Sequence, residues 1–308
     1  MSAFSVIQRR TRNDARVNTR HRTPATWCPG CGDFGVVKAL NRPCRKSAAP
    51  TKCTSGYRLF VRISTATSRY GFHTIHGRSL PVARAAKLAN SGLTVVAAGG
   101  DGDGYGIGGN HFMHTARENH DITYIVFNNE IFGLTKGQTS PTSPKGHKSK
   151  TQPHGSAKEP LRPLPMSLNA GASYVARTAA VNPNQAKDII AEAIEHDGFA
   201  HVDFLTQCPT WNKDAKHYVP YTDVQQSDEF DFDVSDRAEA AEMMRKTEER
   251  LYEGEVLTGR MYIEDERPSY GEEKRQIGEM PEEPLAERYF DDEYEWERTY
   301  DLFLDKHK

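Results

Sequence analysis

The stretch LTVVAAGGDGDGYGIGGNHFMHTARENHDITYIVFNN (93–129) decides the fold of this chain. It begins with a β-branched run, 93–100, and closes with a second apolar run, 122–129, and both are typical of buried strands. Between them, 104–120 indicates a glycine-rich turn that opens a helix. Strand, helix and strand in this order predict an α/β fold with a parallel sheet flanked by helices.

The same alternation continues on both sides of this stretch. A helix is predicted over 80–92, ending at Gly92, and strand, helix and strand over 172–178, 182–196 and 201–209. Asn182 is the expected N-cap of the last helix, with Pro183 in its first turn. Residues 135–165 are rich in Pro, Ser, Gly and Lys and predict a long loop, a kind that is usually functional or disordered.

Polar side chains follow two of the predicted strands. Asp101 ends the strand 93–100, and Asn129 ends the strand 122–129. Neighbouring parallel strands would bring both to one edge of the sheet, where α/β proteins bind ligands. A carboxylate, an amide oxygen and a backbone carbonyl, together with diphosphate oxygens, make an octahedral Mg²⁺ site. The glycines and the following helix start favour a phosphate group at the same place.

Five cysteines are spread along the chain, and three sit in suggestive contexts. Cys28 and Cys31 form a C-x-x-C turn in TWCPGCGDFG (26–35), and Cys208 follows the last predicted core strand. The turn alone is compatible with zinc, a redox dithiol or an iron–sulfur cluster. A thioredoxin-like dithiol is disfavoured because no strand precedes the turn. A tetrathiolate cluster needs one more cysteine.

Taken together, five segments resemble one family. TWCPGCG, YGFHTIHGR (70–78), GGDGDGYGIGGNHF (99–112), NNEIFGLTKGQTSPTS (128–143) and TQCPTWN (206–212) occur in this order. They look like the β subunit of two-subunit 2-oxoacid:ferredoxin oxidoreductases, over roughly 26–40 and 70–222. The resemblance implies a thiamine-diphosphate-binding fold, and the composition adds to it the long loop 135–165 and an acidic C-terminal tail.

The resemblance also implies the cofactors and their ligands: thiamine diphosphate, Mg²⁺ and one 4Fe-4S cluster. The implied Mg²⁺ ligands are Asp101, Asn129 and the main chain of Ile131. The implied cluster ligands are Cys28, Cys31 and Cys208. Further cofactor contacts are expected from His76, Gly100, Gly102, Asp103, Gly133 and Leu134. Catalytic candidates are Lys136, which would meet a substrate carboxylate or a coenzyme A phosphate, and His76.

The function implied is the oxidative decarboxylation of pyruvate with coenzyme A, giving acetyl-CoA, carbon dioxide and reduced ferredoxin. The alternative substrate is 2-oxoglutarate. An α subunit would carry the other half of the cofactor site, so this chain alone should be inactive. Two competing interpretations are a non-redox thiamine-dependent enzyme and, from another class, a zinc-stabilised non-catalytic binding protein. No nucleic-acid or membrane partner is expected.

Charge is distributed unevenly. Residues 223–308 hold 28 acidic and 12 basic side chains, whereas 1–222 hold 14 acidic and 28 basic ones. Much of the basic excess lies in 8–24 and 41–69, two stretches with no clear pattern. One interpretation is that they are basic disordered loops. The hypothesis that we favour is a shifted reading frame, because the Gly-Cys-Ser that should supply the fourth cluster cysteine, near Leu59, is missing. Cys53 is the nearest substitute, and Cys44 is assigned no role.

These observations predict three parts: an N-terminal arm over 1–25, a cofactor-binding domain over 26–222, and an acidic extension over 223–308 with an amphipathic helix at 236–252. No apolar run is long enough to span a bilayer, and the first residues lack the apolar core of a signal peptide. The expected location is the cytoplasm.

Overall fold

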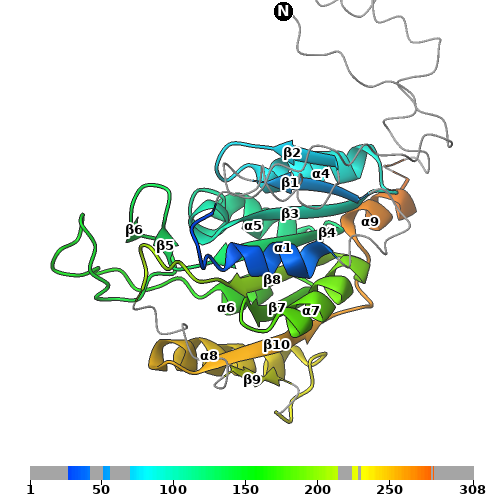
Figure 1. The fold of residues 1–308 in the computed structure, drawn as a ribbon. Coiled ribbons are helices and arrows are strands. Elements are labelled where there is room, and N and C mark those ends of the chain that lie inside the picture. Colours follow the sequence, from blue (N-terminus) through cyan, green and yellow to red (C-terminus); the bar gives the residue numbers. More distant parts are fainter. Residues whose placement is uncertain are drawn as a thin grey trace, which may run out of the picture.

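A computed structural model describes residues 27–41, 51–55, 70–213, 224–227, 230–278 and 280, with backbone only at 41, 51–55, 70, 71 and 224. Within these residues, eight strands form one sheet in the order β2-β1-β3-β4-β8-β7-β10-β9 (Figure 1). Neighbouring strands from β2 to β7 run parallel, while β10 is antiparallel to β7 and parallel to β9. The parallel sheet predicted from the alternating pattern is confirmed.

The described elements, in chain order, are α1 (Asp33–Asn41), β1 (Thr51–Ser55), β2 (Tyr70–His73), α4 (Ser79–Ala89), β3 (Thr94–Gly100), a π-helical turn (Gly102–Ile107), α5 (Gly109–Arg117), β4 (Ile122–Asn128), β5 (Ile131–Phe132), β6 (Gln138–Thr139), α6 (Pro163–Ala170), β7 (Tyr174–Ala179), α7 (Pro183–Glu195), β8 (Phe199–Leu205), β9 (Val224–Gln226), α8 (Arg237–Glu253), β10 (Val256–Ile263) and α9 (Tyr270–Gln276). The predicted core elements are present, with ends that shift by up to four residues.

Two findings go beyond the predicted elements. β1 lies inside the patternless stretch 41–69 and pairs in parallel with both β2 and β3. β10 lies in the acidic C-terminal part, for which only helix was predicted, and it joins the same sheet beside β7. The part of the chain after the predicted boundary at 222 therefore adds β9 and β10 to this sheet and α8 to its core.

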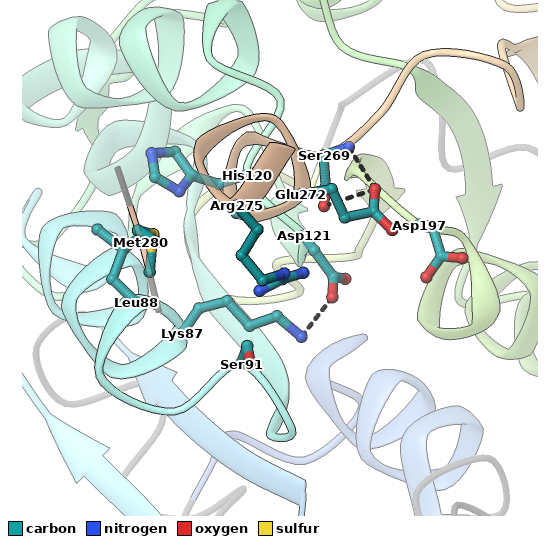
Figure 2. Close-up of a pocket in the computed structure, with 11 residues that line it drawn as sticks. Lys87, Leu88, Ser91, His120, Asp121, Asp197, Ser269, Glu272, Arg275 and Met280 are labelled. Atoms are coloured by element: carbon teal, nitrogen blue, oxygen red, sulfur yellow. Dashed lines mark hydrogen bonds and ion pairs between the residues drawn. The ribbon is translucent and has the colours of Figure 1, made fainter. Parts of the chain in front are cut away.

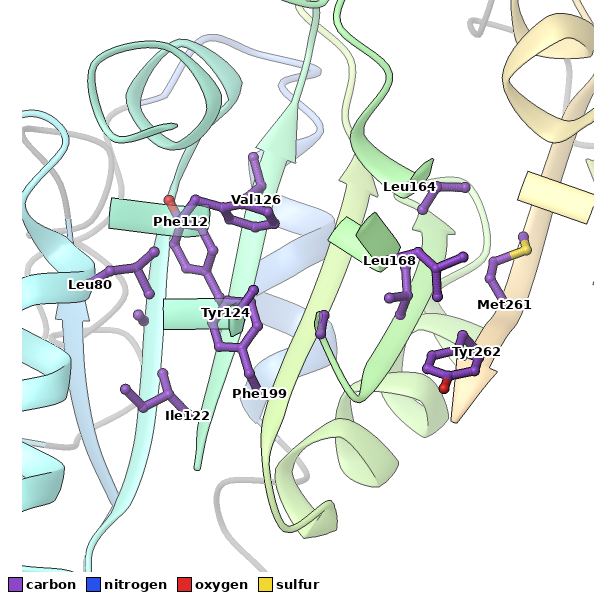
Figure 3. Packing of buried hydrophobic residues seen from close by; sticks show 14 of the residues in the cluster. Leu80, Phe112, Ile122, Tyr124, Val126, Leu164, Leu168, Phe199, Met261 and Tyr262 are labelled. Carbon is purple, nitrogen blue, oxygen red and sulfur yellow. The ribbon is translucent and has the colours of Figure 1, made fainter. Parts of the chain in front are cut away.

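Helices cover both faces of the sheet, because the central strands carry apolar side chains on both faces. On β4, Tyr124 and Val126 point to the face covered by α4, α5, α6 and α8, while Ile125 and Phe127 point to the face covered by α1 and α7. Figure 3 shows the first of these cores, in which Phe112 of α5 packs edge-on against Phe199. Burying one such side chain stabilises the fold by roughly 1.5–3 kcal/mol.

A cavity of about 210 Å³ lies at the opposite edge of the sheet from the strand ends predicted to bind ligands (Figure 2). Its lining includes Asp121, directly before β4, and Asp197, shortly before β8. Lys87 forms an ion pair with Asp121 across it, as Figure 2 shows. Since ligands of parallel sheets bind beyond the carboxyl ends of the strands, this cavity is not the predicted site.

Among the described helices, none combines the length and apolarity that a bilayer crossing requires.

Candidate active site

The ends of β3 and β4 place two sequence-predicted positions side by side. The parallel register pairs Gly100 with Phe127, so that Asp101 and Asn128 follow at the same edge. The hydroxyl oxygen of Thr142 lies 2.7 Å from Oδ2 of Asp101 and 2.9 Å from Oδ1 of Asn128. Asp101 and Asn128 thus approach one hydroxyl group, and the predicted meeting of Asp101 with the next residue, Asn129, stays a prediction.

The predicted metal ligands suit a hard cation. Asp101 is 2% exposed, and burial raises its pKa to about 6 although Ser140 and Thr142 donate hydrogen bonds to it. A divalent cation would offset the cost of a buried carboxylate. The backbone N–H of Ile131 donates to Oδ1 of Asn129 at 3.2 Å, which folds this loop around the amide. Magnesium binding by Asp101, Asn129 and the Ile131 carbonyl stays a prediction.

Glycines of the π-helical turn let other groups approach closely. A Cβ on Gly102 would lie 2.0 Å from the ring of Phe132, and one on Gly104 would lie 2.4 Å from the hydroxyl of Tyr124. Gly100, by contrast, has its nearest such neighbour at 3.9 Å, which leaves open backbone beside Asp101. This suits the predicted phosphate contact by Gly100, while Gly102 is already covered on its Cβ side by an aromatic ring.

Asp103 binds a neighbouring turn with its side chain. Its Oδ1 accepts hydrogen bonds from the Gly77 N–H at 2.7 Å and lies 3.0 Å from Nδ1 of His76. Burial raises its pKa, and its Oδ2 is buried without a hydrogen-bond partner. The predicted diphosphate contact of Asp103 is untested, but this carboxylate brings the half-exposed His76 to the same edge as Asp101.

The remaining predicted residues lie on the loop after β4. Gly133 faces the cysteine region, because a Cβ built there would lie 3.9 Å from Sγ of Cys208. Leu134 and Lys136 are exposed, and Lys136 adopts a positive φ of 76°. An exposed apolar side chain next to an exposed ammonium group is available to a ligand or a partner.

The cysteine turn packs directly on the loop that carries Cys208. The Gly32 N–H donates to the Gln207 carbonyl at 3.0 Å. Cys28 is exposed, Cys31 and Cys208 are half-buried, and all three are free thiols. Burial raises the pKa of Cys31, with smaller contributions from Asp33 and from Cys208. The thiol of Cys208 therefore acts on the thiol of Cys31, although the two residues lie 177 positions apart in sequence.

Three thiols on two adjoining loops suit part of an iron–sulfur site. Within the described residues, however, no group of three or more His, Cys, Asp or Glu side chains is close enough to hold a metal ion. A cluster would need these loops to close further and a fourth ligand to join them. Cluster binding by Cys28, Cys31 and Cys208 stays a prediction.

The backbone of β1 argues against Cys53 as the fourth ligand. Cys53 pairs with Val96, four residues before the level of Gly100. A strand rises about 3.3 Å per residue, so Cys53 lies about 13 Å short of the edge at which Asp101 and Cys208 lie. Cys44 and Leu59 lie outside the described residues.

Known proteins place the chain in a family. Residues 52–204 match the family model for the thiamine pyrophosphate enzyme, C-terminal TPP binding domain. Subunit beta of 2-oxoacid:ferredoxin oxidoreductase 2 from Aeropyrum pernix is 33% identical over 297 residues, which cover 91% of this chain and 94% of that protein. The chain belongs to the β subunits of 2-oxoacid:ferredoxin oxidoreductases. This membership removes the support for a zinc-stabilised, non-catalytic binding protein.

Two further relatives of this β subunit bear on its function. The 2-oxoacid:ferredoxin oxidoreductase subunit beta of Saccharolobus solfataricus is 40% identical over 195 residues, which cover 60% of this chain and 63% of that protein. A solved structure, the 2-oxoglutarate:ferredoxin oxidoreductase from Magnetococcus marinus with 2-oxoglutarate, coenzyme A and succinyl-CoA bound, is similar at a TM-score of 0.75. It is 35% identical, and the match covers 92% of this chain and 93% of that one.

Sequence reasoning missed several polar residues of this β subunit. Thr142 lies in a Ser/Thr-rich part of the long loop, where nothing distinguishes it from its neighbours. Arg177 and Asp203 are fully buried in β7 and β8, and Arg177 Nε donates to Asp203 Oδ2 at 2.8 Å. Glu248 of α8 accepts from Arg177 at 2.8 Å. The usable signal was a single charged residue inside each of two largely apolar strands.

Proposed function

We propose that this chain is the β half of an enzyme that oxidatively decarboxylates a 2-oxoacid. In the reaction the bond between the carboxyl and 2-oxo carbons breaks, carbon dioxide leaves, and a thioester forms with coenzyme A. The two electrons released reduce ferredoxin one at a time. The observation that carries this proposal is that Asp101 and Asn128, at the ends of β3 and β4, both lie within hydrogen-bond distance of Thr142, next to the loop of Cys208.

Thiamine diphosphate, when bound, supplies the nucleophile and the electron sink that this decarboxylation needs. In this chain, Asp101 and Asn129, with the Ile131 carbonyl, would hold Mg²⁺ against the diphosphate. The open backbone at Gly100 and the start of the following helix would receive phosphate oxygens. Asp103 fixes the turn of His76 at the same edge. These groups bind and orient, so catalysis here rests largely on positioning.

Cys28, Cys31 and Cys208 would ligate a 4Fe-4S cluster, which supplies one-electron transfer to ferredoxin. The fourth ligand is proposed to come from a Gly-Cys-Ser near Leu59 in the corrected reading frame. Resequencing the DNA across codons 8–69 tests that idea, and an unchanged reading would contradict it. Iron and acid-labile sulfide in the purified protein, and their loss in Cys208→Ser, test the cluster itself.

Two substrates are supported to a similar degree. Overall resemblance favours pyruvate, whereas relatives named 2-oxoglutarate synthase subunit KorB, from Archaeoglobus fulgidus at 41% identity among others, favour 2-oxoglutarate. An α subunit is proposed as the partner, because the relatives are named as β subunits. The exposed Lys136 is proposed to meet a substrate carboxylate or a coenzyme A phosphate.

The test uses the chain purified together with its α subunit. Bound thiamine diphosphate and ferredoxin reduction are measured with pyruvate and with 2-oxoglutarate, each with coenzyme A. We expect stoichiometric cofactor and activity with one of the two substrates, and we expect Asp101→Asn to lose both. A complex that reduces ferredoxin with neither substrate and retains no thiamine diphosphate would overturn the proposal.

A matched pair of variants tests Lys136. Lys136→Met should raise KM for coenzyme A or for the 2-oxoacid, whereas Lys136→Arg should keep much of the wild-type value because the positive charge remains. Met and Arg, like Lys, are unbranched at Cβ and should tolerate the positive φ of this position equally, so the two variants should differ mainly in charge. An unchanged KM for both reactants in Lys136→Met would show that this lysine is only a surface charge.

A further inference from the structure

Thr142 joins the two strand ends of the proposed cofactor site. It comes from the loop between β6 and α6, 41 residues after Asp101, and is 1% exposed. Its hydroxyl is within hydrogen-bond distance of Asp101 Oδ2 on the β3 side and of Asn128 Oδ1 on the β4 side. The amide oxygen of Asn128 can only accept a hydrogen bond, and so can the carboxylate of Asp101 when it is ionised. The Thr142 hydroxyl is therefore the donor in this group of three oxygens.

The turn that carries Thr142 is itself fixed. The backbone N–H of Ser140 donates to Oγ of Ser143 at 2.8 Å, and that hydroxyl in turn donates to the Glu130 carbonyl at 2.5 Å. Glu130 has a φ of 57°, a left-handed conformation uncommon for a residue with a side chain. A hydrogen bond therefore holds the tight turn after β4 against the loop of Thr142.

A buried ion pair orients Asn128 from behind. Nδ2 of Asn128 donates to Oδ1 of Asp203 at 3.1 Å, and the other carboxylate oxygen accepts from Arg177. An ionised carboxylate accepts only, so it must face the NH₂ of the amide and leaves Oδ1 of Asn128 pointing at Thr142. All of these side chains are at most 1% exposed.

Arg177 is held in turn from the far side. Its Nη2 donates to Oε1 of Glu248, which also accepts from the backbone N–H of Leu164 at 3.2 Å. Burial lowers the pKa of Arg177, but the two carboxylates outweigh this and raise it, so the guanidinium stays charged. Buried ion pairs add little net stability and are retained in some proteins for structural specificity. Here that specificity is directed at the strand end that carries Asn128 and Asn129.

We propose that Thr142 is a positioning residue for the metal–diphosphate site. Asp203, held by Arg177, orients the amide of Asn128 and through it the hydroxyl of Thr142. The inference rests on the proposed function. Thr142 orients the carboxylate that would bind the metal, and the buried ion pair fixes the amide on which Thr142 rests. Neither Thr142 nor Asp203 needs to touch the substrate.

The test measures thiamine diphosphate binding, not turnover. In the complex with the α subunit, the dissociation constant is determined by calorimetry over a range of Mg²⁺ concentrations. Thr142→Val keeps the shape and removes the hydroxyl, and we expect about tenfold weaker binding, as for a lost hydrogen bond to a charged group. More Mg²⁺ should be needed for half-saturation. Thr142→Ser keeps the hydroxyl and should restore near-wild-type binding.

Thr139→Val is the matched control, since its hydroxyl bonds Gln152 in the same loop at 2.8 Å, away from Asp101. It should bind the cofactor like the wild type. Asp203→Asn, which disturbs the amide of Asn128 without large change of shape, should weaken binding in the same direction as Thr142→Val. Melting temperatures of all variants are recorded, and Thr142→Ala replaces Thr142→Val should that variant not fold.

The outcomes separate the two proposals. A wild-type complex that binds no thiamine diphosphate would overturn the proposed function. A wild type that binds it, with Thr142→Val within twofold of that affinity, would leave the function standing and overturn the inference. Equal weakening in Thr142→Val and Thr142→Ser would show that packing, rather than the hydroxyl, matters at this position, and would also overturn it.

Discussion

Gly32 shows how one missing side chain brings two loops together. A Cβ at this position would lie 2.4 Å from the backbone nitrogen of Gln207. Backbone cannot yield as the end of a side chain can, so any larger residue must push the Cys28–Cys31 turn away from the loop of Cys208. The closeness of the two loops depends on this glycine.

We therefore expect Gly32→Ala to lower the iron and sulfide content of the purified protein several-fold while thiamine diphosphate binding is largely kept. Gly271→Ala, in α9, is the control, because a Cβ there meets only the end of the Arg275 side chain, at an ordinary contact distance of 3.7 Å. Iron content and cofactor affinity are measured on the same preparations. Full iron occupancy in Gly32→Ala would contradict the assignment of these loops to one cluster.

At the residue level, the sequence predicted those positions whose place in the fold depends on the residues next to them in the chain. Asp101 and the Asn128–Asn129 pair were singled out because each directly follows an apolar run, and the parallel register of β3 and β4 puts Asp101 and Asn128 at the same strand ends. Thr142 was missed because its role depends on where a long loop folds back, which no local pattern encodes. Asp203 was missed because β8 is largely apolar on both faces. Its sequence therefore does not show which face Asp203 lies on or which residues it contacts.

Among the elements, α8 links the C-terminal part to the site. Asp236 is its N-cap and accepts from the backbone N–H groups of Ala238 and Glu239 at 2.7 and 3.0 Å. About three turns into the helix, Glu248 accepts a hydrogen bond from the fully buried Arg177. The beginning of this helix thus contributes to the placement of an ion pair in the core.

Asp236→Ala should lower the free energy of unfolding by about 1 kcal/mol, as is typical for a lost N-cap. Chemical denaturation of the wild type and of the variant gives the difference directly. Asp236→Asn retains a capping oxygen and should lie close to the wild type. A variant in which alanine costs nothing would mean that packing alone fixes the start of α8.

Elements with a clear period or cap were predicted well, and those without were not. α7 begins after Asn182, whose side chain accepts from the Gln185 N–H as expected of a cap. β1 has the polar sequence TKCTS, so only its two neighbouring strands identify it as a strand. β10 contains Gly259 at a φ of 134° and a register shift between Arg260 and Tyr262, which interrupt the alternation that marks strands.

For the molecule as a whole, buried neutral histidines make stability depend on pH. Burial lowers the pKa of His201 to about 4, from an ordinary 6.5 in the unfolded chain. Tyr105 donates to Asp203, so the Nε2–H of His201 donates to the tyrosine oxygen, while Nδ1 is buried without a partner. Protonation would put a second N–H into this dry site.

The sign follows from proton binding. Between pH 6.5 and 4 the unfolded chain binds a proton at this position that the folded protein refuses, so the contribution of His201 is complete above 6.5 and is lost as the pH falls. In this window the slope of stability against pH should therefore be less positive in His201→Gln than in the wild type, by up to about 1.4 kcal/mol per pH unit. His114→Gln, at the surface, is the control.

The comparison with the wild type matters because other groups act in the opposite direction. Burial raises the pKa of Asp33 to about 7, so the folded protein holds a proton there that the unfolded chain releases. Only the difference between variant and wild type isolates the histidine. Identical slopes for His201→Gln and the wild type between pH 6.5 and 4 would contradict the buried neutral state.

The central pair of strands has one more consequence, on the timescale of local opening. Every residue of β4 and of β8 is buried, and each of these strands is bonded to a neighbour on both sides. Their backbone amides can be reached by solvent only if the sheet itself comes apart. In deuterium-exchange experiments these amides should be the last to exchange, and those of the edge strand β2 should exchange far sooner. The turn at Asn128 and Asn129 thus directly follows a strand whose backbone amides are expected to be among the last to exchange.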